Sequence, residues 1–128
     1  MLLFEDDALR RNSNVDIAFM VDATLSMERN IIAARDNIGD LVRKVKEEFH
    51  DNTVRVAYVA YRDYSERERR IETYDFTEDI PAFTESLGNV EAFAGYDDPE
   101  DVLGGINATL NLHWEAANKL FFQIGKLY

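Results

Sequence analysis

The chain has 128 residues, 46% of them apolar, which is the size and composition of one globular domain. Its formal net charge of −11 argues against nucleic-acid binding, because phosphate backbones are bound by clustered Lys and Arg. The absence of cysteine excludes disulfides and thiolate metal sites, and no apolar run approaches the roughly 20 residues of a membrane span. We therefore expect a single domain over residues 1–128 that binds neither nucleic acid nor membrane.

The first residues, Met-Leu-Leu-Phe-Glu-Asp-Asp, lack the basic start and long apolar stretch of a secretory signal peptide. The sequence therefore predicts a cytoplasmic location by default. Residues 1–14 are expected to form a short lead-in segment before the first strand.

Strand-like and helix-like patterns alternate along the chain. Residues 15–21 are almost continuously apolar, which is typical of a parallel strand buried on both faces. Residues 26–50 carry apolar residues at spacings of three and four, which predicts one long amphipathic helix. The sequence also predicts strands at 53–62, 71–76 and 119–124, and helices at 77–87 and 99–112.

This order of elements favours a three-layer α/β fold, with a mostly parallel, Rossmann-like open sheet and helices on both faces. The strand at 71–76 follows the preceding strand after a short charged turn, so it should pair antiparallel at an edge of the sheet. Right-handed crossovers place the first strand centrally. The carboxyl ends of the parallel strands then open on one face, where such sheets bind their ligands.

The residues that follow the first strand carry the main functional signal. Asp22, Thr24 and Ser26 alternate in a short loop before the long helix. One carboxylate and two hydroxyls can turn toward one point, and oxygen ligands of this kind suit Mg²⁺, and also Mn²⁺ or Ca²⁺. An ion with so few charged ligands stays electropositive and can accept an acidic residue from another protein. A structural alternative is open, in which Ser26 caps the helix and Asp22 and Thr24 form a turn.

The segment Asp22-Ala-Thr-Leu-Ser26 resembles the first motif of the von Willebrand factor type A domain. In that family, an Asp-x-Ser/Thr-x-Ser loop after the first strand builds a metal-ion-dependent adhesion site. Residues 60–63 (Ala-Tyr-Arg-Asp) and 97–102 (Asp-Asp-Pro-Glu-Asp-Val) resemble the variants associated with alpha-type protein kinases. The resemblance covers nearly the whole chain in the family's order, and it implies a non-enzymatic protein-interaction module.

The resemblance also extends the candidate metal site beyond the first loop. Asp97 corresponds to the second-loop ligand, which gives a predicted set of Asp22, Thr24, Ser26 and Asp97. Asp98 is the neighbouring candidate, but its position before Pro99 favours the cap of the following helix.

The chain departs from the family's pattern after the strand at 119–124. The family has a third-loop Asp there, whereas this chain has Gly125-Lys126-Leu127, and the family's last strands and helices are missing. The resemblance therefore implies a domain truncated after its fourth strand, with incomplete or weak metal occupancy. It also leaves Lys119–Ile124 as an open sheet edge, for which we expect homodimerisation or strand exchange.

Two other functions fit the same loop. Asp-x-Thr-x-Ser after a strand also resembles the phosphate-accepting motif of haloacid-dehalogenase-type phosphohydrolases, with Asp22 as nucleophile and Asp97 with Asp98 holding Mg²⁺. No lysine stands at a helix start to neutralise a phosphate, which favours the interaction module. The third alternative is a metal-free interaction domain with a vestigial site. Asp63, just past the end of the second strand, is expected to form a turn or an ion pair with Arg62 or with the arginines that follow, and a supporting place behind the metal ligands is the alternative.

Overall fold

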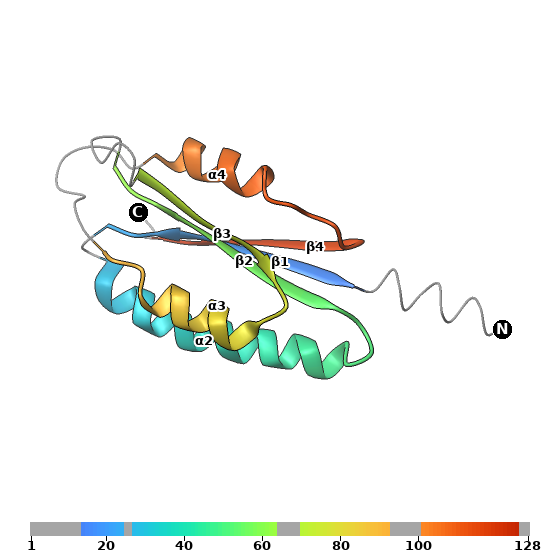
Figure 1. The fold of residues 1–128 in the computed structure, drawn as a ribbon. Helices are drawn as coiled ribbons and strands as arrows, with labels where there is room; N and C mark the ends of the chain where they lie inside the picture. The colour runs from blue at the N-terminus through green and yellow to red at the C-terminus, as the bar shows by residue number, and fades with distance from the viewer. Residues whose placement is uncertain (1–13, 25–26, 64–69, 93–100, 126–128) are drawn as a thin grey trace, which may run out of the picture.

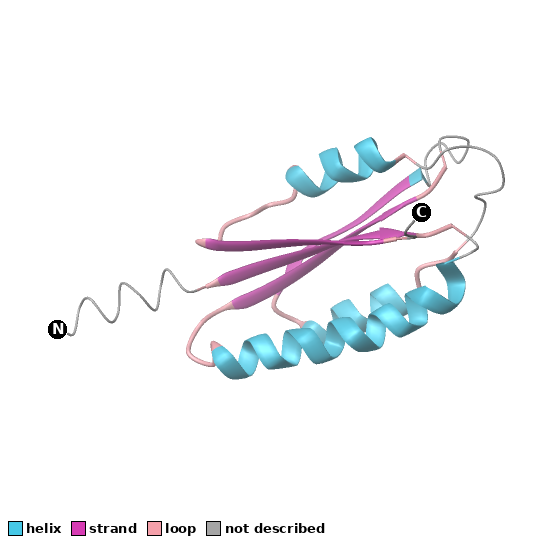
Figure 2. Ribbon diagram, turned by 180° about the vertical axis from the view of Figure 1, so that it is seen from behind, coloured by secondary structure: helices cyan, strands magenta, loops and turns pink. Residues whose placement is uncertain are grey.

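The computed structural model describes residues 14–24, 27–63, 70–92 and 101–125. These residues form a four-stranded sheet with α4 over one face and α2 and α3 over the other (Figures 1 and 2). The elements in chain order are β1 (Val15–Asp22), α2 (Glu28–Glu48), β2 (Val54–Tyr61), β3 (Ile71–Thr77), α3 (Ile80–Gly88), α4 (Val102–Leu110) and β4 (Asn118–Ile124). The three-layer α/β architecture predicted from the sequence is confirmed.

The strand order is β3-β2-β1-β4, so β1 lies in the interior of the sheet. It pairs parallel with β2 on one side and with β4 on the other, and β3 pairs antiparallel with β2 at the edge. The register places Asp22 beside Tyr61, and Val21 beside Ile124. The three parallel strands therefore end together, as open α/β sheets require for a ligand site.

All eight residues of β1 are buried, which explains why the strand is apolar almost throughout. On one face, Phe19 lies in a core with Ile38 of α2 and Phe83 of α3. On the opposite face, Ala18 lies in a smaller core with Val59 of β2 and Leu112. Alternate residues of the central strand thus hold helices on both sides of the sheet.

The start of α4 differs from the sequence prediction. We expected the helix to begin at Pro99, but its N-cap is Asp101, whose Oδ1 accepts a 2.8 Å hydrogen bond from Gly104 N. The backbone N–H of Asp101 donates to Arg62 O at 2.8 Å, which ties this residue to the end of β2. The helix therefore begins only after that tether, at Val102.

The other two helices also begin later than predicted. α2 begins at Glu28, and its N-cap residue Met27 makes no side-chain capping bond. α3 begins at Ile80 behind the capping carboxylate of Asp79. None of the helices in the described part of the chain has the length and apolar character needed to cross a membrane.

Candidate functional site

Asp22 and Thr24 form a closed turn at the carboxyl end of β1. Asp22 is 3% exposed and Thr24 is 1% exposed. Asp22 Oδ1 accepts hydrogen bonds from Thr24 N at 2.9 Å and from Thr24 Oγ1 at 2.7 Å. These bonds make the Asx-type turn that the structural alternative predicted, and they also hold the carboxylate and the hydroxyl side by side.

The backbone around this turn is fixed to the sheet and to α2. Ala23 N donates to Tyr61 O at 2.9 Å, which continues the β1–β2 ladder one residue past β1. Met27 N donates to Thr24 O at 2.9 Å, which connects the turn to the first residues of the helix. The main chain around Asp22 and Thr24, the two predicted ligands that the structure describes, is therefore fixed by hydrogen bonds to β2 and to the start of α2.

The described hydrogen bonds to the Asp22 side chain engage one of its two carboxylate oxygens. Within the described part of the chain, both bonds to its carboxylate reach Oδ1, and both donors belong to Thr24. Because the Thr24 hydroxyl donates its proton to Asp22, the lone pairs of Oγ1 are turned elsewhere. A carboxylate oxygen and a hydroxyl oxygen are the donor types that hard divalent cations prefer.

The remaining predicted ligands lie outside the described residues. Ser26 and Asp97 belong to the segments 25–26 and 93–100, so the structure tests neither of them as a ligand. The prediction that Asp98 caps the following helix is wrong, because the N-cap of α4 is Asp101. Among the residues it does describe, no group of three or more His, Cys, Asp or Glu could hold a metal ion. The proposed ligand set therefore remains a prediction.

The residue after β4 lies against the same turn. A Cβ atom built on Gly125 would lie 3.1 Å from the Tyr61 hydroxyl oxygen and 3.7 Å from Asp22 Cβ. Gln123 Nε2 donates to that hydroxyl at 3.4 Å. Gly125, the first residue after β4, thus lies close to Asp22 and to the Tyr61 hydroxyl.

A buried arginine organises the carboxyl end of β2. Arg62 is fully buried, and its guanidinium bonds to Glu72 Oε1 at 3.0 Å and to Glu91 O at 2.6 Å. Asp63 beside it is 2% exposed, and the capping residue Asp101 pairs with Arg70 Nε at 2.8 Å through Oδ2. The sequence did not lead us to predict the buried contacts of Arg62. The position of this charged residue directly after an apolar strand was the signal that could have indicated them.

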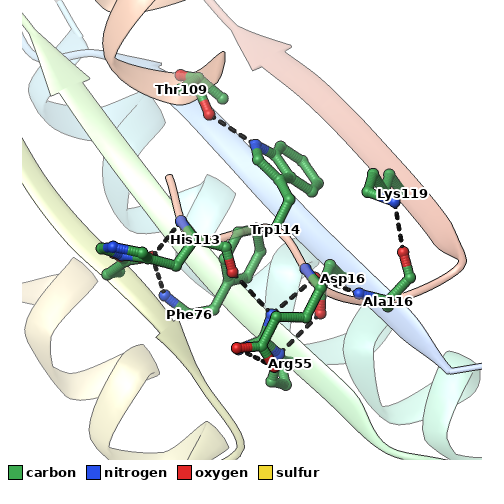
Figure 3. Close-up of polar contacts among 10 residues, drawn as sticks. Asp16, Arg55, Phe76, Thr109, His113, Trp114, Ala116 and Lys119 are labelled. Atoms are coloured by element: carbon green, nitrogen blue, oxygen red, sulfur yellow. Dashed lines mark hydrogen bonds and ion pairs between the residues drawn. The ribbon is translucent and has the colours of Figure 1, made fainter. Parts of the chain in front are cut away.

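A second buried carboxylate lies at the opposite end of β1. Asp16 has no exposed surface, and its two oxygens accept from Arg55 Nε at 2.9 Å and Arg55 Nη2 at 2.7 Å (Figure 3). Its Oδ2 also accepts from the backbone N–H groups of Glu115 at 2.7 Å and Ala116 at 2.9 Å. Burial alone raises the pKa of Asp16, but these hydrogen bonds and the Arg55 charge bring the pKa below its ordinary value.

The Arg55 side chain extends this cluster over the α4 face of the sheet. Its Nη2 also donates to His113 O at 3.0 Å, and its guanidinium carbon lies 4.9 Å from the centre of the Phe76 ring. Trp114 packs edge-on against Phe76 and donates from Nε1 to Thr109 O at 2.9 Å (Figure 3). The segment between α4 and β4 is thereby attached to β1 and β2, and this end of the sheet is closed by internal contacts.

Comparison with known proteins agrees with the fold and the order of the motifs. The sequence profile of the von Willebrand factor A domain matches residues 16–122. The chain is 30% identical over 109 residues to Alpha-protein kinase vwkA of Dictyostelium discoideum, which covers 84% of this chain and 17% of the kinase. No solved structure matches it significantly. The profile match spans most of the chain, and the chain belongs to the von Willebrand factor A domain family, close to the variant found in an alpha-type protein kinase.

Proposed function

We propose that this chain is a protein-interaction module that binds an acidic residue of a partner protein through a divalent cation. The observation that carries the proposal is the Asp22–Thr24 turn, which presents a buried carboxylate and a hydroxyl at the carboxyl end of the central strand. Family membership supports the interaction role, and the resemblance of the loop to the adhesion-site motif supports the metal.

The proposed ligands are Asp22, Thr24, Ser26 and Asp97, and the proposed ion is Mg²⁺, with Mn²⁺ or Ca²⁺ as substitutes. Mg²⁺ keeps near-octahedral geometry and holds several waters, so one of these waters can be replaced by a carboxylate from a partner. Two of the four ligands are neutral hydroxyls, which leaves positive charge on the ion to attract that carboxylate. No bond is made or broken, so the module is proposed to be non-enzymatic.

Occupancy of the site is proposed to be weak. The position that approaches Asp22 from β4 is Gly125, which brings no carboxylate to the ion. Lys126 follows it in the sequence, and its positive charge opposes cation binding. We therefore expect binding that requires excess metal, and stabilisation that rises with metal concentration.

The test is thermal unfolding of the wild-type chain and of Asp22→Ala in Mg²⁺, in Mn²⁺ and in EDTA. Metal should raise the melting temperature of the wild type and leave that of Asp22→Ala unchanged. Asp36→Ala is the matched control, because Asp36 lies on α2 with its side chain 69% exposed. A wild-type melting temperature that is the same in metal and in EDTA overturns the metal-dependent mechanism and favours a metal-free interaction domain.

The phosphohydrolase alternative is separated by a turnover assay on the same samples. An aryl phosphate is incubated with wild type and Asp22→Ala in Mg²⁺. We expect no release of phosphate above the buffer rate. Turnover that disappears in Asp22→Ala would instead assign Asp22 as a nucleophile.

A further inference from the structure

Tyr61, which ends β2, and Arg62, which follows it, are bonded to main chain from other parts of the described structure. Tyr61 O accepts a hydrogen bond from Ala23 N at 2.9 Å, within the turn that follows β1. Arg62 N donates to Arg70 O at 2.8 Å, directly before β3. Arg62 O accepts from Asp101 N at 2.8 Å, directly before α4. The end of β2 therefore joins segments that are distant in sequence.

The Arg62 side chain reaches one more segment, the end of the chain that follows α3. Its Nη2 donates to Glu91 O at 2.6 Å, and its Nη1 lies 3.0 Å from Glu72 Oε1. Val90 and Ala92, on either side of Glu91, pack against the main core. An arginine is seldom fully buried unless it is paired, and here part of that pairing goes to a backbone carbonyl. Arg62 thus fixes the main chain at Glu91.

These contacts hold both ends of one stretch of chain. The Arg62 side chain binds Glu91 O, and the Arg62 carbonyl binds Asp101 N. Between these two points lie residues 93–100, which include Asp97, the proposed ligand from the second loop. Fixing the ends of a loop removes part of the conformational freedom that its residues would otherwise lose when an ion binds.

The end of the stretch at Asp101 is fixed by side-chain contacts as well. Asp101 is 4% exposed, its Oδ2 lies 2.8 Å from Arg70 Nε, and its Oδ1 accepts from Gly104 N at 2.8 Å. A Cβ atom on Gly104 would lie 2.1 Å from Asp101 Oδ2, so a side chain at this position would displace the carboxylate. Gly104 therefore belongs to the same arrangement.

We infer that Arg62 is a positioning residue of the proposed cation site, which anchors the loop that carries Asp97. This role rests on the proposed function, because it acts through one of the proposed ligands. The same anchor connects the two loops of the site, since the adjacent Tyr61 carbonyl binds Ala23 between Asp22 and Thr24. Arg62 itself is not proposed to touch the ion.

The planar guanidinium suits this role better than an ammonium group would. Its Nη1 and Nη2 donate in fixed directions, here toward the Glu72 carboxylate and the Glu91 carbonyl. Lysine carries the same charge on a single nitrogen without this fork. Arg62→Lys therefore leaves the net charge near the site unchanged and alters the geometry of the anchor.

The first test is a titration with Mn²⁺, in which electron paramagnetic resonance measures the free ion. Partners that orient metal ligands typically contribute 10–100-fold to metal affinity, so Arg62→Lys should weaken Mn²⁺ binding about tenfold. Glu72→Gln is the matched control, because an amide oxygen can still accept the bond from Arg62 while the charge of the ion pair is lost. This control should bind Mn²⁺ as the wild type does.

The second test is amide hydrogen exchange in EDTA, which needs no bound metal. The amide of Asp101, which donates to Arg62 O, should exchange faster in Arg62→Lys than in wild type. The amides of Glu115 and Ala116, which donate to Asp16, should exchange at the same rate in both proteins. A general loss of stability would instead speed up exchange in both regions.

Arg62 is buried, so circular dichroism checks that Arg62→Lys folds, and Arg70→Gln is the second variant. Arg70 is 40% exposed, and its substitution removes the contact with Asp101 Oδ2. Mn²⁺ binding should weaken in Arg70→Gln as well, by less than in Arg62→Lys. An unchanged Mn²⁺ affinity in Arg70→Gln would count against the anchoring of this loop.

The outcomes separate this role from the proposed function. A wild-type chain that binds no Mn²⁺ overturns the proposed function and this role with it. Mn²⁺ binding by the wild type that is unchanged in a folded Arg62→Lys overturns the role of Arg62 alone. Weaker binding accompanied by faster exchange at Glu115 and Ala116 also overturns it, because the effect is then one of general stability.

Discussion

Strand β1 carries one buried carboxylate at each end, and the two are held in different ways. Both oxygens of Asp16 are engaged, by the two nitrogens of the Arg55 fork and by two backbone N–H groups. Within the described residues, the hydrogen bonds to the Asp22 side chain all reach one oxygen, and they come from the N–H and hydroxyl of Thr24. Asp16 is 0% exposed and Asp22 is 3% exposed, so burial does not distinguish them.

The difference lies in the charge of the donors. A cation neutralises Asp16 inside the protein, and its hydrogen-bonding capacity is used to join β1 to β2 and to the segment before β4. The donors to Asp22 in the described residues are neutral, and the opposite charge that we propose for it is the divalent cation. Removing one partner of a buried ion pair strongly destabilises a protein, whereas a carboxylate whose described donors are neutral is compatible with the proposed cation site.

Substitution at Asp16 should have the largest effect on stability. Asp16→Asn removes the anion that lies 2.7 Å from Arg55 and leaves this 17% exposed side chain with the more distant, exposed Glu115 at 3.5 Å, so the free energy of unfolding should fall by about 3 kcal/mol. Urea denaturation measures it, with the exposed Asp36→Asn as control, expected to change stability by at most about 0.5 kcal/mol. If the free energy of unfolding falls no more than in the control, the contacts between Asp16 and Arg55 do not stabilise the fold.

The pH dependence of stability should depend on the same residue. The folded-state pKa of Asp16 lies below its ordinary value of 3.8, because the Arg55 and backbone hydrogen bonds outweigh the opposing effect of burial. The stability that the ionised Asp16 carboxylate contributes is therefore fully present above pH 3.8 and is lost as the pH falls through the folded-state pKa. Urea denaturation at decreasing pH should show a steeper loss for wild type than for Asp16→Asn. Parallel curves for the two proteins would contradict the assignment.

The smallest effect on the free energy of unfolding is expected from a substitution of Asp22 when metal is absent. The Thr24 N–H and hydroxyl can donate to an amide oxygen as well as to a carboxylate, so Asp22→Asn in EDTA should change the free energy of unfolding by less than about 1 kcal/mol. Urea denaturation beside Asp16→Asn makes the comparison direct. Equal losses at the two positions would mean that Asp22 is also structural, and the contrast between the ends of β1 would fail.

Elements with a strong local pattern could be predicted from the sequence. The apolar run before Asp22 fits only a strand covered on both faces, and the spacing of three and four in residues 26–50 fits only an amphipathic helix. The small number of residues between the second strand and Ile71 predicted an antiparallel pair at the edge, and this pairing is confirmed. The start of α4 was placed too early, because the tether that delays it is a bond from Asp101 to Arg62, distant in sequence.

The candidate site was predictable in part, for the same reason. Asp22 and Thr24 are two residues apart, so the turn that joins them follows from the local sequence. The Asp16–Arg55 pair spans 39 residues and the Asp16–Ala116 bond spans 100, and no local pattern contains such contacts. The approach of Gly125 to Asp22 likewise depends on the register of β4.

The sequence by itself determined the α/β class, the central position of β1 and the polar loop that follows it, because hydrophobic periodicity and turn chemistry act over a few residues. Only the tertiary structure decided which carboxylate receives a cation from within the chain. That choice depends on strand pairing, which brings Arg55 beside Asp16 and brings Tyr61, with no charge, beside Asp22.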